Sequence, residues 1–303
     1  MTGHDVGILE PSPPTVNAEP FFADDPVGGD ASFSWQTWIG DDGDRAAWAA
    51  DRWVAGPRAL PPTPAAETLI PTRRALHRLA TYVIAPVRHA ANGKFGMRWT
   101  LGGFGTPFFG DNRQVRVVGD LLVDQHGDAV RSTPITTLAA AAEFLATEID
   151  PATAAEHDSP PVGDPDGALA IDATSADFLG AWFGMGFAAL EALRADAASV
   201  DPSRPQLWPG HFDPAIEEGD EDHRASYGAS PGDDGIAEPY LYAGVWWADR
   251  LGLDDDRNPV EWNAPTFVGR ILKLADFPDG VDPVDTALDF FTSARNAIAA
   301  QPT

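Results

Sequence analysis

The residues best suited to chemistry gather between positions 208 and 242, and the sharpest signal among them is the triplet His211-Phe212-Asp213. Residues two apart share one face of an extended strand, so the imidazole and the carboxylate would converge. Such a pair can act as acid and base, or supply two ligands of a metal site with two histidines and one carboxylate. A plain turn is the simpler explanation, with His211 bound to local backbone and Asp213 capping the turn before Pro214.

A metal at this triplet would need a further ligand. The last histidine of the chain is His223, which follows an acidic loop at 217–222. His211, Asp213 and His223 are therefore weak metal candidates, because the second histidine of such a triad usually lies far downstream. The acidic loop lacks the spaced ligands of an EF-hand and is better explained as a solvated loop. The sequence leaves the cofactor unknown.

An alternating aromatic stretch lies just downstream, at 239–247. Tyr240, Tyr242, Gly244 and Trp246 share one face of the predicted strand, and apolar residues fill the other. An aromatic face with a small residue in its middle can stack a sugar or a heterocycle, although cross-strand packing explains it as well. From these segments we predict the following ligand-binding residues: Trp208, His211, Asp213, Tyr227, Asp233, Glu238, Tyr240 and Tyr242.

Several familiar catalytic motifs are excluded. Residues 228–232 match the nucleophile elbow G-x-S-x-G, but Pro231 follows Ser230 and has no N–H for an oxyanion hole. No histidine follows Ser230 to complete a triad. The Gly-rich run at 102–105 does not open a helix, so it is no dinucleotide fingerprint. A P-loop, an HExxH motif and a CxxC motif are all absent from the sequence.

Composition narrows the setting and the partners. The 303 residues carry a net charge of −26 and no cysteine. That charge would repel nucleic acid, and the chain lacks disulfides, a run of about 20 apolar residues and a basic signal-peptide start. We therefore expect a soluble cytoplasmic protein with a small-molecule ligand and no nucleic-acid or membrane partner. Whether it forms a homo-oligomer stays open.

The charge is uneven along the chain. Residues 72–119 hold eight basic side chains and a single acid, Asp111. One interpretation is an anion-binding face. The favoured one is that this basic stretch docks onto an acidic part of the same chain or of a second copy, since arginine is common at interfaces.

The pattern of helices and strands predicts an α+β fold of two β-sheet lobes with flanking helices. We expect an N-terminal arm at 1–66, rich in Pro and Asp and carrying four tryptophans, a first α/β lobe at 67–150, a linker at 151–174 and a second lobe at 175–303. The lobes could form one domain. Helices are predicted at 72–85, 136–149, 175–194, 266–274 and 284–299, and strands at 95–109, 114–124, 129–135, 206–217, 224–230 and 239–247.

Two details of this pattern bear on packing. The helix at 175–194 is apolar nearly all round and contains Gly180, Gly184 and Gly186, which predicts a buried helix approached closely by another backbone. The segments 103–107 and 210–214 echo one another, Gly-Phe-Gly-Thr-Pro against Gly-His-Phe-Asp-Pro. The echo suggests a helix–strands–helix pseudo-repeat.

Several segments together resemble a known family. They are Leu76–Ala80, Gly102–Pro107, Gln206–Asp213, Tyr227–Asp233 and Glu238–Tyr242. Over roughly residues 72–300 the chain is similar to a family of conserved actinobacterial proteins of unknown function. The resemblance implies a bacterial cytoplasmic setting and brings no catalytic residues with it.

These signals do not identify a reaction. We expect a ligand-binding protein without established catalysis, with its site where 208–213, 227–233 and 238–242 meet. One alternative is an enzyme that uses His211 as acid or base with Asp213 or Glu238, with or without a metal. A second alternative is a protein-interaction module that acts through its Trp-rich arm.

Overall fold

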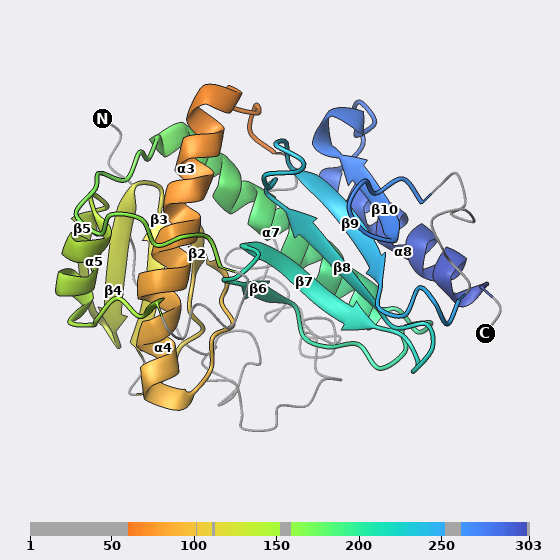
Figure 1. The fold of residues 1–303 in the computed structure, drawn as a ribbon, viewed down its shortest axis with the longest axis horizontal. Coiled ribbons are helices and arrows are strands. Elements are labelled where there is room, and N and C mark those ends of the chain that lie inside the picture. The colour runs from red at the N-terminus through yellow and green to blue at the C-terminus, as the bar shows by residue number, and fades with distance from the viewer. Residues whose placement is uncertain (1–59, 101, 111–112, 152–158, 252–261, 302–303) are drawn as a thin grey trace.

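The computed structural model describes residues 60–100, 102–110, 113–151, 159–251 and 262–301. It confirms the predicted fold class: the described chain is α+β, with two five-stranded antiparallel sheets and flanking helices. In each half the chain order is helix, five-stranded meander, helix (Figure 1). Residues 1–59, which make up most of the predicted arm, lie outside the described residues.

The first lobe is built on one long helix and one sheet. The helix consists of α3 (Ala66–Leu79), a π-helical turn η1 (Ala80–Ile84) and α4 (Ala85–Asn92). The sheet has the order β1 (Arg98–Thr100), β2 (Gly103–Gly105), β3 (Arg113–Val118), β4 (Leu121–His126) and β5 (Ala129–Pro134). Helix α5 (Leu138–Leu145) closes the lobe, and the side chain of Thr137 caps it by accepting the N–H of Ala140.

The second lobe repeats this plan. Helix α7 (Ala173–Ala195) precedes a sheet of β6 (Gln206–Trp208), β7 (Asp213–Glu218), β8 (Ala225–Ser230), β9 (Tyr240–Val245) and β10 (Gly269–Lys273), and a 3-10 turn η3 (Leu274–Asp276) and helix α8 (Pro283–Ala299) follow. The two sheets meet at one isolated antiparallel bridge between Met97 and Leu207. The first strands of the two meanders therefore lie side by side at the middle of the molecule.

Helix α7 is the central core element. It contacts strands of both sheets as well as α3 and α8. A Cβ on Gly180 would lie 2.9 Å from the Cα of Gly103 in β2, and one on Gly186 would lie 2.8 Å from the Cβ of Ala229 in β8. The close approach of another backbone predicted for the glycines is confirmed at Gly180, whereas the close neighbours of Gly186 are side-chain atoms of Ala229 and Pro214. By length and composition α7 could also cross a membrane, but 83% of its apolar window is buried inside the protein, as in a core helix.

Two aromatic side chains from the echoed segments meet at this centre. The rings of Phe104 and Phe212 lie 5.0 Å apart, edge to face, and both contact Phe183 of α7, at 5.9 and 5.1 Å. Edge-to-face pairs of this kind contribute about 0.5–1.5 kcal/mol beyond the burial of their area. The echo between 103–107 and 210–214 thus corresponds to matching positions at the junction of the lobes.

Two helix predictions need correction. The predicted end of the first helix at residue 85 is wrong. A π-helical turn, with Ala85 N–H bonded to Ala80 O, shifts the backbone out of α register before Pro86, and the helix continues to Asn92. The predicted helix at 266–274 is wrong, since Gly269–Lys273 pair with β9 as edge strand β10. Ile271 and Leu272 are adjacent, so in a strand their side chains lie on opposite faces, and this short apolar pair does not tell a helix from a strand; the pairing with β9 makes it a strand.

Three predicted strands are hairpins. The segments 95–109, 114–124 and 206–217 each fold back on themselves and supply two adjacent antiparallel strands. Gly102 and Gly119, both with positive φ, provide the turns in the first two segments. The third turn, at 209–212, carries His211.

Part of the basic stretch docks onto the second lobe and the linker through Arg73, Arg74 and Arg78, whereas Arg88, Arg113 and Arg116 have partners within the first lobe. Arg73 donates to backbone carbonyls of the second lobe, those of Pro231, Asp233 and Ala237. Arg78 donates to backbone carbonyls of the linker, those of Val162 and Asp164. Arg74 pairs with Asp234 at 2.7 Å. The partners are mainly carbonyl oxygens, so net charge alone could not have identified them.

Candidate functional site

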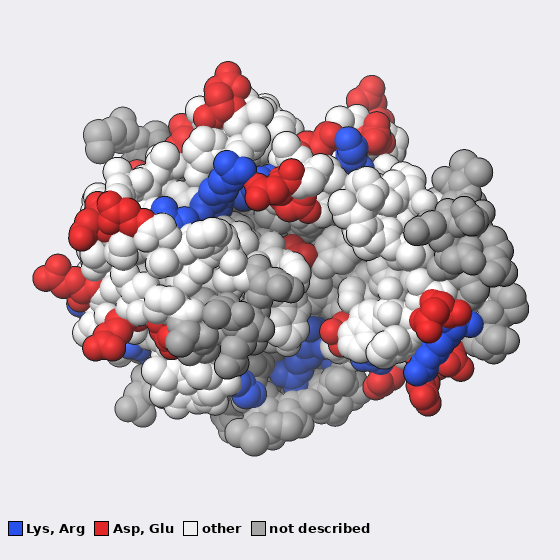
Figure 2. All heavy atoms as spheres, viewed as in Figure 1, with Lys and Arg blue, Asp and Glu red and all other residues white. Residues whose placement is uncertain are grey.

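The second sheet has one covered face and one open face. Tyr227, Ala229 and Leu241 belong to the face that α7 and α8 cover, and Tyr227 packs edge to face on Phe291 of α8 at 6.3 Å. The alternate residues of β7, β8 and β9 line a hollow of about 760 Å³ on the other face. Figure 2 shows this side of the molecule hollowed between the two lobes.

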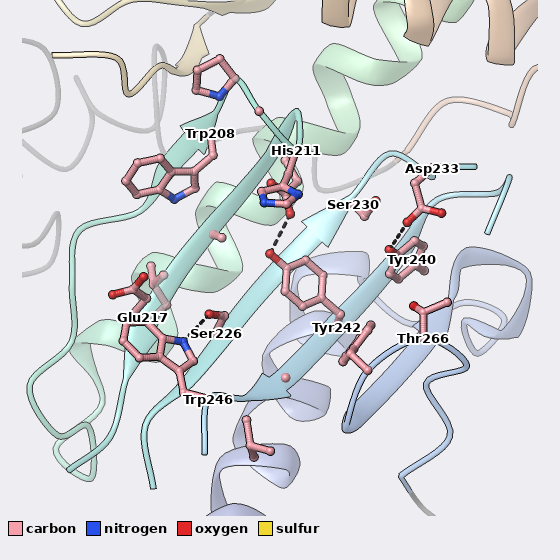
Figure 3. Close-up of a pocket in the computed structure, with 18 of the residues that line it drawn as sticks. Trp208, His211, Glu217, Ser226, Ser230, Asp233, Tyr240, Tyr242, Trp246 and Thr266 are labelled. Atoms are coloured by element: carbon pink, nitrogen blue, oxygen red, sulfur yellow. Dashed lines mark hydrogen bonds between the residues drawn. The ribbon is translucent and has the colours of Figure 1, made fainter. Parts of the chain in front are cut away.

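The lining combines aromatic rings with carboxylates and hydroxyls (Figure 3). Its residues with polar or aromatic side chains are Phe95, Trp208, His211, Asp213, Glu217, Ser226, Ser230, Asp233, Tyr240, Tyr242, Trp246, Thr266 and Phe267. A concave surface of this size with a few convergent polar groups is the usual form of a small-molecule site.

Asp213 is the buried charge at the centre of the hollow. Its relative exposure is 4%, and its Oδ2 accepts a hydrogen bond from the Tyr242 hydroxyl at 2.7 Å. Its other oxygen, Oδ1, is buried and has no hydrogen-bond partner in the described part of the chain. Burial raises the pKa of this carboxyl, while the Tyr242 hydrogen bond and the nearby His211 act in the opposite direction.

A glycine allows Tyr242 to reach Asp213. Gly228 and Tyr242 are directly paired between β8 and β9. A Cβ on Gly228 would lie 2.5 Å from the Tyr242 ring, so the ring lies flat over the bare backbone of β8 and its hydroxyl extends to β7. Burial and the charge of Asp213 raise the pKa of the Tyr242 phenol well above its usual range, which keeps it a donor.

His211 stands on a tight turn between β6 and β7. The N–H of Phe212 donates to Trp208 O at 2.7 Å, and Phe212 takes a left-handed conformation with φ of 58°. The triplet is therefore not an extended segment, and the predicted sharing of a strand face is wrong. The turn nevertheless brings His211, which is exposed, within electrostatic range of Asp213.

The first lobe holds this turn through one face of its long helix. His77 Nε2 lies 2.8 Å from Pro209 O and 3.0 Å from Gly210 O, and the Thr81 hydroxyl donates to Pro209 O at 2.7 Å. The His77 ring also stacks on Phe212, with centroids 5.2 Å apart. Burial lowers the pKa of His77 to about 4, so the ring is neutral and Nε2 carries the proton that both carbonyls accept.

One helical turn earlier, Arg73 holds the loop between β8 and β9. Its guanidinium donates to the carbonyls of Asp233 at 3.1 Å and Ala237 at 2.9 Å. The Asp233 side chain in turn accepts the Tyr240 hydroxyl at 2.6 Å and the N–H groups of the following turn. Both loops at this end of the hollow are thus fixed by the first lobe.

At the other end of the hollow, two side chains frame the opening. The indole N–H of Trp246 donates to the Ser226 hydroxyl at 2.9 Å, and the Trp246 ring is 43% exposed. Glu217 lies 3.9 Å from Arg224, and burial raises the pKa of its carboxyl. Trp208, 39% exposed, lines the hollow from β6.

The structure brings six of the eight predicted ligand-binding residues into the hollow: Trp208, His211, Asp213, Asp233, Tyr240 and Tyr242. Tyr227 does not belong to it, because β8 places odd-numbered side chains on the face covered by α7 and α8. Glu238 does not either, because it pairs with Lys273 at 2.9 Å beside a second, Pro-rich hollow.

The weak metal set is not assembled. His223 lies beyond the far end of β7 from His211, where it bonds Asp220 at 2.9 Å and Gln301 O at 3.1 Å. Among the described residues no group of three or more His, Cys, Asp or Glu side chains is arranged to hold a metal ion.

Some lining residues were not predicted. Ser226 and Ser230 follow the period of two along β8, so that strand's alternation was the signal that could have found them. Thr266 and Phe267 come from the segment wrongly predicted as helix, and nothing local indicated their role.

Compared with known proteins, the sequence matches no family model, no curated protein and no solved structure. The resemblance to an actinobacterial family stays a prediction. What the chain does must therefore be argued from the geometry of the hollow.

Proposed function

We propose that this chain is a small-molecule-binding protein whose ligand occupies the hollow on the open face of β7, β8 and β9. One observation carries the proposal: a buried carboxylate, Asp213, lines a concavity of about 760 Å³ and has an oxygen without a hydrogen-bond partner among the described residues. A buried, unpaired polar atom costs about 1–3 kcal/mol, and a bound ligand can supply the missing donor.

The arrangement of the surrounding residues supports the same proposal. Arg73, His77 and Thr81 fix both loops at one end of the hollow, so the lining is held in place by the body of the protein. A rigidly held site binds a ligand without first ordering its own loops.

A library screen tests the proposal. We expect a chemically diverse set of small molecules to contain binders that raise the melting temperature of the purified protein. The matched variants are Trp246→Ala and Trp247→Ala, because these neighbouring side chains are 43% and 41% exposed and only Trp246 lines the hollow. Binding should weaken at least tenfold in the first variant and stay unchanged in the second. Equal loss in both would place the ligand elsewhere.

A catalytic use of the same residues is the second candidate. It is favoured by His211, which is exposed at the hollow and lies close enough to Asp213 to affect the pKa of that carboxyl. Carboxyls with raised pKa values beside a histidine are common in acid–base catalysis. His211→Ala should then abolish turnover of a substrate found by screening while its binding persists. Unchanged turnover would exclude this role.

A further inference from the structure

The negative charge of the residues that line the hollow restricts which ligands it can bind. Among the described residues, the lining holds three carboxylates, Asp213, Glu217 and Asp233, and no lysine or arginine. A phosphate or carboxylate placed there would be repelled, and a cation would be attracted. A cluster of acids alone identifies no ligand, so it matters which of these carboxylates already have hydrogen-bond or ion-pair partners.

Two of the three carboxylates already have partners. Asp233 accepts the Tyr240 hydroxyl and two backbone N–H groups, and Glu217 lies 3.9 Å from Arg224. Asp213 accepts the Tyr242 hydroxyl on Oδ2, and its Oδ1 is buried without a hydrogen-bond partner in the part of the chain that the structure describes. Asp213 is therefore the carboxylate available to a ligand.

A ligand for Oδ1 must donate a hydrogen bond. A neutral hydroxyl can do so, but a hydrogen bond between two charged groups is roughly twice as strong as a neutral one. A quaternary ammonium has the charge but no N–H to donate. A primary or secondary ammonium has both, and it also neutralises a charge that is costly to bury.

The aromatic lining suits the rest of such a ligand. Trp208, Tyr242, Trp246 and Phe267 all contribute rings to the lining of the same hollow. The faces of these rings attract cations, most strongly for tryptophan, and they stack on flat apolar groups. The organic part of an amine thus finds aromatic surface around the carboxylate that holds its nitrogen.

We propose that the hollow recognises a primary or secondary organic amine in its protonated form, an inference that rests on the proposed binding function. The ammonium N–H donates to Asp213 Oδ1, and the carbon skeleton lies against the aromatic rings. Tyr242 is a positioning residue, since it holds the carboxylate by its other oxygen.

Matched probes test this by calorimetry at pH 7.5. The amine set is 2-phenylethylamine, tryptamine and 1,4-diaminobutane. The comparisons, which keep the phenylethyl group and change the polar group, are 2-phenylethanol, trimethyl(2-phenylethyl)ammonium and 3-phenylpropanoate. We expect at least one amine to bind at least tenfold more tightly than the alcohol and the quaternary cation, with no binding of the anion. Equal affinity for the alcohol or the quaternary cation would overturn the proposal, and so would failure of every amine to bind.

Two variants with the same change of charge complete the test. Asp213→Asn should weaken amine binding at least tenfold, while Asp289→Asn, on the exposed surface of α8 across the sheet, should leave it unchanged. If neutral compounds bind in the hollow and Trp246→Ala weakens them but Asp213→Asn does not, the binding function stands and the amine inference fails. If no compound of either set responds to Trp246→Ala, both fail.

Discussion

Lowering the pH should destabilise the packing of the turn that carries His211, because His77, which contacts that turn, is buried in its neutral form. Burial lowers the pKa of His77 to about 4 in the folded protein, against 6.5 for a free histidine. Between these values the unfolded chain takes up a proton that the folded chain excludes. The stability that His77 contributes is therefore complete above about pH 6.5 and is lost as the pH falls toward 4.

The magnitude follows from the difference in pKa. Each pH unit is worth about 1.4 kcal/mol, so a gap of about 2.5 units corresponds to roughly 3 kcal/mol. The hydrogen bonds to Pro209 and Gly210 are not the source of this loss, because an imidazolium still carries the Nε2 proton. The cost comes from burying a charge, with smaller contributions from the nearby His211 and Arg73.

The assay compares wild type with His77→Gln, whose amide can donate to the same carbonyls but does not titrate. Unfolding free energies are measured by urea at several values between pH 7.5 and 4.5. Titration of the carboxylates changes the free energy of unfolding equally in both proteins, so the difference between the two free energies reports His77 alone. We expect the wild type to lose most of about 3 kcal/mol relative to the variant over this range. If the difference in unfolding free energy between wild type and His77→Gln did not change with pH, the reasoning would be refuted. The difference at pH 7.5 is the control, because it measures any packing on Phe212 that the variant has lost.

Three further predictions concern single substitutions. Asp213→Asn, which we expect to weaken amine binding, should raise the melting temperature at neutral pH. Burial is the largest influence on this carboxyl, and its raised pKa means that the free energy of unfolding falls as the pH rises through that pKa; a lower melting temperature would contradict this. Gly228→Ala should cost about 1–3 kcal/mol in urea unfolding and weaken binding, because its Cβ would lie 2.5 Å from the Tyr242 ring; unchanged binding would show that Tyr242 need not lie flat. Gly180→Ala should cost a similar amount through contact with Gly103 but leave affinity within about twofold, as measured on the folded fraction.

Periodicity in the sequence predicted much of the fold, and its failures have local causes. The apolar helix α7 and the amphipathic helix α8 were predicted correctly, because their patterns extend over many residues. Strand β10 was taken for a helix because a short apolar run is ambiguous until its partner strand is known. The hairpin at 114–124 was merged into a single strand because Gly119 was not weighed as a turn.

The candidate site was partly predictable for the same reason. The alternation along β9 placed Tyr240 and Tyr242 on one face, and the triplet at 211–213 identified the neighbouring turn. Tyr227 was assigned to the wrong face of the sheet. Helices cover either the odd-numbered or the even-numbered side chains of β8, and a shift of one residue in the pairing register exchanges the two faces. Glu238 was grouped with the site by its position in the chain, yet it pairs with Lys273 away from the hollow.

The part of the site that sequence reasoning missed lies in the other lobe. Arg73, His77 and Thr81 are spaced four apart, so they lie along one face of the long helix, and each donates to a carbonyl of a loop beside the hollow. Their targets are more than 120 residues away, and backbone carbonyls leave no trace in side-chain composition. The apolar residues of this helix were sufficient to predict its existence, whereas its polar face became informative only once the second lobe was in place. Hence substitutions on this face should affect the second lobe's hollow before they affect the first lobe's own sheet.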